Sequence, residues 1–280
     1  MKYFQIVFAA LLLSGAVGCD EKMIMIPEFT AEDTGRRVLI EEITGVSCPN
    51  CPAGAATIEA FKETFPGRVV SVAYHSPPFL VSPLSGSEYD FARDEAQSID
   101  QFIGESVGKP SAAVNRTTFD GQNRTWLGTI DSWAEFVRAE LERPTLFGLE
   151  IENEYNEDTR EVNITVTATP QQNAVGNYFI SVMILESHII DAQLDQTTEI
   201  EDYEHNHVFH KLITQSISGD PFATNLTADS DIVKTYSYTI PVNTEEFDVP
   251  WVAENCEIVA FITNGQGQVE QAAEAKVIEE

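Results

Sequence analysis

Hydrophobic and polar positions follow two different periods along the chain, and the change falls near residue 145. Before it, short apolar runs alternate with segments whose apolar residues recur at helical spacing. The expected elements, in order, are a strand over 38–43, a helix over 52–65, a strand over 69–74, a helix over 94–103, a strand over 111–115 and a helix that begins between 129 and 132 and ends before Pro144. A strand, a helix and a strand in succession predict a parallel strand pair joined by a crossover helix.

After residue 145 the apolar and polar residues alternate with a period of two. The strand-like runs cover 149–152, 162–168, 179–185, 208–217, 236–240, 258–263 and 269–277. About seven short strands separated by turn sequences, without a helical pattern, are typical of an immunoglobulin-like β-sandwich. The predicted fold class is therefore α/β plus all-β, with an α/β domain over 37–144 and a β-sandwich domain over 145–280.

The first 18 residues have the pattern of an export signal. Lys2 supplies a positive charge, an apolar run covers 3–13, and small residues precede Cys19. This ending resembles a bacterial lipobox, which implies cleavage before Cys19 and its acylation by fatty acids such as palmitate. The alternative is an ordinary signal peptide, cleaved nearby, with Cys19 as a bystander. In the lipobox interpretation, 1–18 is removed, 19–36 is a lipidated tether, and the protein is anchored in the outer membrane, facing the periplasm or the cell surface.

Charge narrows the choice of partners. The formal net charge is −29, and it is unevenly divided: 20–144 holds 20 acidic and 11 basic residues, net −9, and 145–280 holds 25 and 4, net −21. Such a chain is a poor partner for nucleic acid, because binding requires cations to neutralise phosphates. The acidic residues of the second half are expected to form a strongly hydrated surface. Acidic runs such as 199–204 could also bind a divalent cation, but none has EF-hand spacing.

Two cysteines stand where the first buried strand passes into the first helix, as Cys48-Pro-Asn-Cys51. The amide groups and dipole of a helix N-terminus favour a thiolate, and a second cysteine in the first turn can form or resolve a disulfide. A Cys-x-x-Cys pair can also be half of a zinc site, but no further ligands have suitable spacing. We therefore predict a Cys48–Cys51 disulfide in an oxidising compartment, no metal and no cofactor. Cys256, in an apolar run, is expected to be a buried, unpaired residue.

The order of strand, Cys-x-x-Cys, helix, strand, proline and final helix over 37–144 resembles the thioredoxin fold. Proteins of that fold place a cis-proline before a strand, facing the cysteine pair. Pro110, in Gly108-Lys109-Pro110-Ser111, has the matching position. The resemblance implies that Pro110 would help position a substrate chain.

A second resemblance takes in the whole chain. Its marks are the lipobox, the motif Thr-Gly-x-x-Cys-Pro-Asn-Cys-Pro over 44–52, Tyr-His after the second strand, Val-Asn-Arg over 114–116, and His-Asn-His-Val-Phe over 205–209. Together they are similar to the outer membrane protein 28-related family of Bacteroidota lipoproteins. That family combines a thioredoxin-like domain with an immunoglobulin-like C-terminal domain. Its members have been regarded as surface antigens or adhesins, so the resemblance implies an architecture more than an activity.

Four histidines are candidate site residues. His205 and His207 would share one face of a strand, where they could bind a metal, and His210 could join them if the strand bends. Structural or hydrogen-bonding roles are the preferred interpretation. His75 follows the second strand at the side of the sheet where the cysteines are expected, so it could act as a base for Cys48 or anchor a loop.

Two hypotheses about function follow. In the first, the protein exchanges thiols with exported proteins: Cys48 attacks, Cys51 resolves the mixed disulfide, and Pro110 positions the substrate. In the second, the protein is a non-catalytic surface binding or adhesin-type module, Cys48–Cys51 is a structural disulfide, and the acidic β domain meets an unknown surface partner. In both, lipid on Cys19 holds the protein at the membrane.

Overall fold

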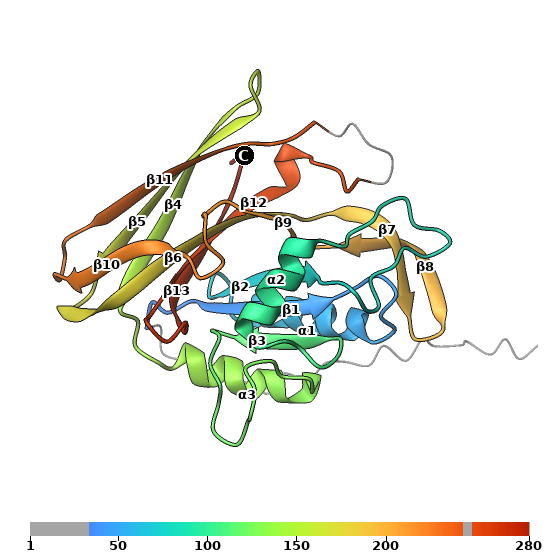
Figure 1. The fold of residues 1–280 in the computed structure, drawn as a ribbon, viewed down its shortest axis with the longest axis horizontal. Coiled ribbons are helices and arrows are strands. Elements are labelled where there is room, and N and C mark those ends of the chain that lie inside the picture. Colours follow the sequence, from blue (N-terminus) through green and yellow to red (C-terminus); the bar gives the residue numbers. More distant parts are fainter. Residues whose placement is uncertain (1–33, 243–247, 280) are drawn as a thin grey trace, which may run out of the picture.

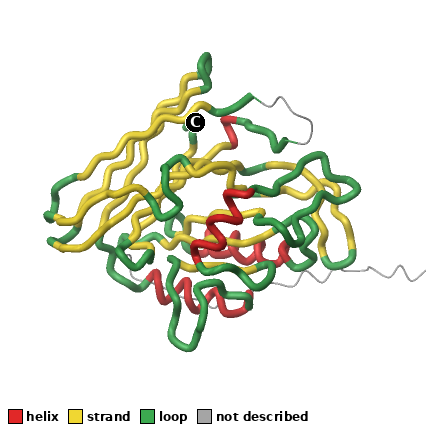
Figure 2. Tube along the Cα trace, viewed as in Figure 1, coloured by secondary structure: helices red, strands yellow, loops and turns green. Residues whose placement is uncertain are grey.

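The computed structural model describes residues 34–242 and 248–279, and the predicted signal, Cys19 and most of the tether lie outside these ranges. The fold is mostly β, with few helices and mixed sheets (Figures 1 and 2). The helices are α1 (Cys51–Thr64), α2 (Asp94–Ile103), α3 (Ile130–Leu141) and the 3-10 turn η1 (Ala253–Asn255). Among the described residues, no helix is both long and apolar enough to cross a membrane.

Thirteen strands are present in the described ranges. They are β1 (Val38–Thr44), β2 (Val69–His75), β3 (Ser111–Val114), β4 (Phe147–Asn156), β5 (Glu161–Pro170), β6 (Ala174–Glu186), β7 (Ile189–Asp195), β8 (Thr198–His205), β9 (Val208–Leu212), β10 (Asp220–Leu226), β11 (Ile232–Thr239), β12 (Cys256–Thr263) and β13 (Val269–Lys276).

One eight-stranded sheet forms the centre of the molecule, in the order β13-β12-β6-β9-β2-β1-β3, with β10 paired to β6. Strands from both sides of residue 145 therefore belong to the same sheet. The junction is the short parallel contact of β2 with β9, where Ala73 is paired with Val208 and the Ala73 amide donates to the His207 carbonyl oxygen at 2.8 Å. The predicted division at 144 and 145 stays a prediction.

The predicted opening of strand, crossover helix and parallel strand is confirmed. β1 and β2 pair in parallel along seven residues each, and β3 pairs with β1 in the antiparallel direction. Apolar residues of α1 and α3 cover one face of these strands, and a second core on the other face includes residues of α2, β6, β9 and β12. Alternate residues of β1 therefore face two different interiors.

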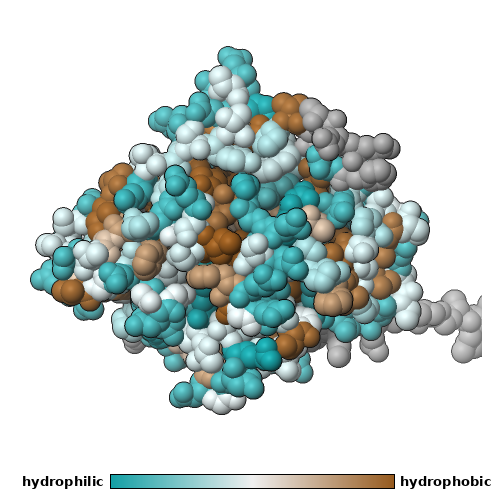
Figure 3. Space-filling view, in the orientation of Figure 1, coloured by the Kyte–Doolittle hydropathy of each residue, from teal (hydrophilic) through white to brown (hydrophobic). Residues whose placement is uncertain are grey.

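In the second half, the three-stranded sheet β11-β5-β4 packs against β6, β10, β12 and β13 through one large apolar core. The alternating exposure along β11 agrees with its alternating sequence. The immunoglobulin-like arrangement stays a prediction. The face in Figure 3 is mainly hydrophilic, with apolar side chains in separate small groups.

Local predictions were accurate where a hydrophobic pattern was strong. α2 has the predicted bounds, and Cys256 is buried and unpaired as expected. The predicted strand over 208–217 ends at Leu212, and β7, β8 and β10 were not predicted. β8 lacks a buried face over most of its length, so its sequence carries little alternation.

Candidate functional site

The predicted disulfide is present at the start of α1. Cys48 and Cys51 are bonded, with their Cα atoms 5.4 Å apart. The Cys48 amide donates to the Gly45 carbonyl oxygen at 3.0 Å, so a turn precedes the helix. The helix begins at Cys51, with Asn50 as its N-cap residue, so Cys48 precedes the helix rather than occupying its first turn.

A β-hairpin from the second half of the chain lies over this turn. β7 and β8 form a separate two-stranded sheet, to the right of the main sheet in Figure 1. The Leu194 amide donates to the Val46 carbonyl oxygen, and the Gln196 amide donates to the Pro49 carbonyl oxygen, both at 2.8 Å. These two bonds fix the hairpin to the residues on either side of the first cysteine.

A buried glutamine adds to this cover. The Gln193 Nε2 atom lies 3.2 Å from the Cys48 carbonyl oxygen and 3.4 Å from the Gly45 carbonyl oxygen, and it donates to both. Cys48 is 0% exposed and Cys51 is 2% exposed. A partner sulfur cannot reach the disulfide in this conformation, since attack requires access to a sulfur atom.

Pro110 lies beside the first turn of α1. The Lys109–Pro110 peptide bond is cis, as the resemblance to the thioredoxin fold implied. Lys109 fixes the neighbouring loop, because its Nζ donates to the carbonyl oxygens of Ser76 and Phe79. Burial lowers the pKa of Lys109 to about 8.

Glu42 faces α1 from the middle of β1. A Cβ atom added to Gly54 would lie 2.5 Å from the Glu42 Oε1 atom and 3.1 Å from the Pro110 Cβ atom. The absence of a side chain at Gly54 therefore leaves room for both. Glu42 is almost fully buried, and its Oε1 atom has no hydrogen-bond partner among the described residues. Burial raises the pKa of Glu42 to about 8, so the carboxyl group is mainly protonated at neutral pH.

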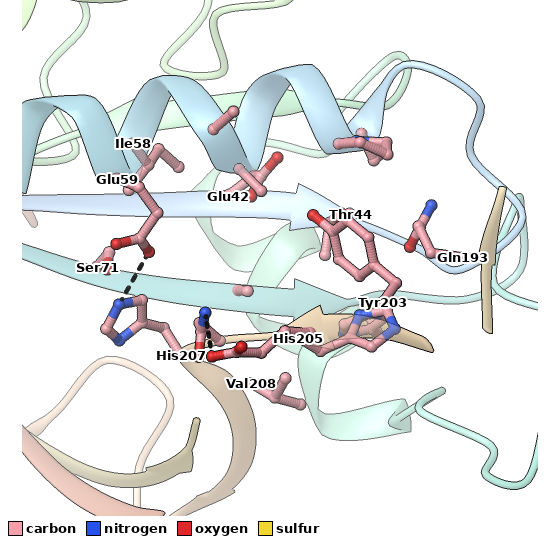
Figure 4. Close-up of a pocket in the computed structure, with 18 of the residues that line it drawn as sticks. Glu42, Thr44, Ile58, Glu59, Ser71, Gln193, Tyr203, His205, His207 and Val208 are labelled. Atoms are coloured by element: carbon pink, nitrogen blue, oxygen red, sulfur yellow. Dashed lines mark hydrogen bonds and ion pairs between the residues drawn. The ribbon is translucent and has the colours of Figure 1, made fainter. Parts of the chain in front are cut away.

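A pocket of about 300 Å³ lies between α1 and the strands beneath it. Its apolar lining includes Ala55, Ala56, Ile58, Val72 and Val208, and its polar lining includes Glu42, Ser71, Tyr203 and His205. Cys51 also borders it. Figure 4 shows Glu42 and Ser71 on the strands below the helix, with Tyr203 and His205 closing one end. The pocket is therefore built by both halves of the chain.

Two neutral histidines border the same pocket. His75 stacks on Phe91, with ring centroids 4.8 Å apart, and the His205 ring lies 4.6 Å from Phe91 and 5.9 Å from His75. Burial keeps the pKa of His75 well below its usual value and lowers that of His205 to about 4. Both rings are therefore uncharged at neutral pH. The His75 side chain packs against an aromatic ring, that of Phe91.

His205, His207 and His210 do not form a common site. β8 ends at His205, and His207 has a φ of 54° in the turn before β9, so the two do not share one strand face. His207 instead lies between Glu59, at 3.2 Å, and Glu257, at 3.0 Å. Burial opposes its charge, but these two carboxylates raise the pKa of His207 to about 9.

The His207 cluster is the one group with metal-like composition in the described residues, together with Glu257 and Glu274. An ammonium group already lies among its ligand atoms, because the Lys62 Nζ atom is 3.2 Å from His207 Nε2 and 3.1 Å from Glu274 Oε2. Lys62 and protonated His207 form ion pairs with these carboxylates, so this cluster is explained as an ion-pair network.

His210 lies apart from the other two. Its Nε2 atom is 2.9 Å from Glu186 Oε2, and its ring stacks on Trp251 with centroids 3.9 Å apart. Burial lowers the pKa of His210 to about 3 and raises that of Glu186 to about 8, so the pair is neutral. The histidines that were grouped in the sequence thus have separate hydrogen-bonding or packing environments.

Sequence reasoning missed Glu42, Ser71, Gln193 and Tyr203. One signal was available: two adjacent glutamates inside an apolar run predicted to be a buried strand. Charged residues are rarely buried without a role, so Glu42 could have been singled out. Gln193 and Tyr203 carried no comparable signal, because they lie on strands that were not predicted.

Comparisons with known proteins agree with this architecture. The family model of outer membrane protein Omp28 matches residues 96–280. The structure of HBP35 of Porphyromonas gingivalis is similar, with a TM-score of 0.63 and 13% identity, over 86% of this chain and 75% of that one. A protein of Agrobacterium tumefaciens has a TM-score of 0.47 and 13% identity, over 90% and 98% of the two chains. No curated protein matches the sequence.

The fold and the family match define a class of protein associated with the outer membrane, with mixed sheets and a Cys-x-x-Cys disulfide. Within that class, the chain belongs to the outer membrane protein Omp28 family.

Proposed function

We propose that this protein is a non-catalytic binding module at the outer membrane, in which Cys48–Cys51 is a structural disulfide. The observation that carries the proposal is the burial of both sulfur-bearing residues beneath the β7–β8 hairpin. The disulfide holds the loop that accepts hydrogen bonds from three residues of the hairpin, Leu194, Gln196 and Gln193. The covalent link thus stabilises the contact between the two halves of the chain.

The test is the redox behaviour of the pair. A structural disulfide has a potential below about −300 mV and does not exchange with the glutathione pool. We expect the purified protein to stay oxidised in glutathione buffers and to be inactive in an insulin-reduction assay. Reduction of insulin by the wild-type protein, but not by Cys48→Ser or Cys51→Ser, would contradict the proposal.

A second function, thiol-disulfide exchange on exported proteins, is favoured by one specific arrangement. Glu42, Gly54 and Pro110 meet at the first turn of α1, as required if a buried acid and a cis-proline serve the cysteine pair. In the reduced protein, Cys48 as thiolate would attack a substrate disulfide. Cys51, after losing its proton to the ionised form of Glu42, which grows as the pH approaches about 8, would then release the reduced substrate and re-form Cys48–Cys51.

This second function requires the hairpin to move, because a substrate cannot reach Cys48 beneath Gln193. Such a protein would reduce insulin faster when the hairpin contacts are weakened. A Gln193→Ala variant with no activity, under conditions in which its disulfide is accessible to small thiols, would exclude catalysis.

We further propose that the chain consists of a thioredoxin-like part and an immunoglobulin-like part, divided near residues 144 and 145. Acylation of Cys19, after removal of 1–18, would anchor the 19–36 tether to the membrane through the lipid and leave the folded part facing the surface or the periplasm. The partner would then be a surface molecule met by the acidic β half, or exported protein thiols in the catalytic alternative, and not nucleic acid. Labelled palmitate should enter the wild-type protein and not Cys19→Ala.

A further inference from the structure

Four polar residues that line the pocket beneath α1 each have a buried atom without a hydrogen-bond partner among the described residues. These atoms are Glu42 Oε1, Ser71 Oγ, His75 Nδ1 and His205 Nε2, and each residue is more than nine-tenths buried. An unpaired buried polar group destabilises a fold by about 1–3 kcal/mol, and most such groups in proteins have a partner. Four of them around one cavity indicate that the partner comes from outside the chain.

These side chains lie in a row along the pocket. Ser71 and His75 are four residues apart on β2, which places them about 13 Å apart along the strand. Glu42 is paired with Ala73, midway between them, and the His205 ring lies beside His75, with centroids 5.9 Å apart. Figure 4 shows the same order, with Ser71 at the left, Glu42 in the middle and His205 at the right. A ligand that reaches all of them is therefore elongated and lies along β2.

The charged groups on the pocket wall already have partners. His207 is paired with Glu59 at 3.2 Å, and a Glu204 carboxylate oxygen lies 2.6 Å from His188 Nδ1. The four unpaired groups are a hydroxyl, a carboxyl that is mainly protonated at neutral pH, and two neutral imidazoles. Each can donate or accept a hydrogen bond, the imidazoles according to which ring nitrogen carries the proton. The site therefore favours an uncharged ligand that carries both donors and acceptors.

The spacing of the polar groups matches that of a polypeptide backbone. They occupy three positions along β2, about 6–7 Å from one to the next, which is two residues of extended chain. A second extended chain beside β2 presents amide groups to one side at the same interval, and each residue supplies an N–H donor and a C=O acceptor. The cavity volume of about 300 Å³ and the apolar lining by Ala55, Ala56, Ile58 and Val208 leave room only for small apolar side chains.

We propose that this pocket binds an extended peptide segment of about four residues with small apolar side chains, lying along β2 between α1 and β8. Its backbone amides face Ser71, Glu42 and the two histidines in turn. As a site of the proposed binding module, the pocket rests on that function and names the partner, an uncharged and extended stretch of another chain. Pro110 does not line this pocket, so the site differs from the substrate position that the thioredoxin resemblance implies.

The test is calorimetric titration of the full chain with N-acetyl-tetraalanine amide, for which we expect one bound peptide per chain. The analogue methylated at its backbone nitrogens lacks the amide hydrogens and should bind at least about tenfold more weakly. Free tetraalanine, with its two charged ends, separates the two sources of such a ligand. We expect it to bind more weakly than the capped peptide. Binding of the free form as tightly as the capped form would support the site and identify its ligand as a free peptide.

Substitutions at both ends of the row test its length. Ser71→Ala and His205→Phe should each weaken binding of the capped peptide by about fivefold, because each removes one polar group. The phenylalanine keeps an aromatic ring beside Phe91. Glu42→Gln retains a donor and an acceptor and should bind within about twofold of wild type, whereas Glu42→Leu should weaken binding as Ser71→Ala does. Ser237→Ala, at an exposed position of β11, is the matched control and should bind as the wild type does.

Three results would overturn the proposal. They are the absence of saturable heat from the capped peptide at millimolar concentration, equal binding of the methylated analogue, and wild-type binding by both Ser71→Ala and His205→Phe while these variants unfold cooperatively. Peptide binding does not require reduction of the disulfide, so any of these results would leave Cys48–Cys51 as a structural bond. Insulin reduction by the wild type would contradict the proposed function without changing the peptide titration, so the two failures are distinguishable.

Discussion

Glu41 and Glu42 are neighbours on β1, equally buried, and they face opposite sides of the same sheet. On one side, Glu41 accepts hydrogen bonds from Arg116 at 2.7 and 2.8 Å and from the Tyr74 hydroxyl at 2.9 Å. On the other side, the Glu42 Oε1 atom has no hydrogen-bond partner among the described residues. On the first side, Glu41 finds its hydrogen-bond partners within the chain, so its role is structural. On the second side, polar atoms without hydrogen-bond partners border a cavity.

The largest expected effect is on the paired side. Arg116→Ala leaves the Glu41 carboxylate buried without its cation, and breaking a buried pair in this way destabilises a protein by about 3–5 kcal/mol. The arginine also packs over the Phe261 ring, 4.7 Å from its centroid, so further contact is lost. Urea unfolding should show this decrease in the free energy of unfolding. Arg124→Ala, at an exposed position, is the control and should change stability little.

Substitution of Glu42, on the unpaired side, should raise the free energy of unfolding. The folded-state pKa of Glu42 is raised from 4.5 to about 8, so the folded protein binds a proton that the unfolded chain releases between these values. Stability from this group is fully present below pH 4.5 and is lost as the pH rises towards about 8. Glu42→Gln removes that loss and should be more stable than the wild type by about 2–3 kcal/mol at neutral pH.

The measurement is the difference in unfolding free energy between Glu42→Gln and wild type across this pH range. A difference that does not change with pH would mean that Glu42 is solvated or paired, and the contrast between the two faces of β1 would then be lost.

The disulfide should contribute less. The bond links residues only three apart, and closing so short a loop removes little entropy from the unfolded chain. Cys48→Ala with Cys51→Ala should therefore destabilise the protein by about 2 kcal/mol. Thermal unfolding of oxidised wild type and the double variant gives the difference. Cys256→Ala changes a cysteine that is buried but unpaired, so it separates the loss of the bond from the loss of packing.

Sequence patterns predicted those parts of the first half of the chain that depend on residues close together in the sequence. The helix over 94–103, the β1-α1-β2 crossover, the cysteine pair and the cis-proline each leave a mark in a few adjacent residues. Those marks arise from periodicity, turn chemistry and backbone restriction, which act over short distances along the chain.

The cover over the site could not be predicted in the same way. It depends on β9 joining β2, and on β7 reaching the cysteine turn, contacts between residues more than 100 positions apart. β8 is largely exposed on both faces, so selection for burial left no alternation in Thr198–His205. The unpaired state of Glu42 likewise depends on which side chains α1 and β8 bring to it, and single-strand patterns do not contain that information.

Gln193→Ala should have the smallest effect on stability and still separates the two proposed roles of the cysteine pair. It removes donors from the carbonyl oxygens of Cys48 and Gly45, and the expected loss is about 1–2 kcal/mol. Because the hairpin keeps its backbone bonds at Leu194 and Gln196, it should loosen rather than detach. Reduction of the disulfide by dithiothreitol should then be faster than in wild type. Gln122→Ala, at an exposed loop position, should leave the rate unchanged. If the rate in Gln193→Ala equals that of wild type, the hairpin does not control access to the disulfide. If the rate rises and insulin reduction appears with it, the buried pair is a covered redox site rather than a purely structural one.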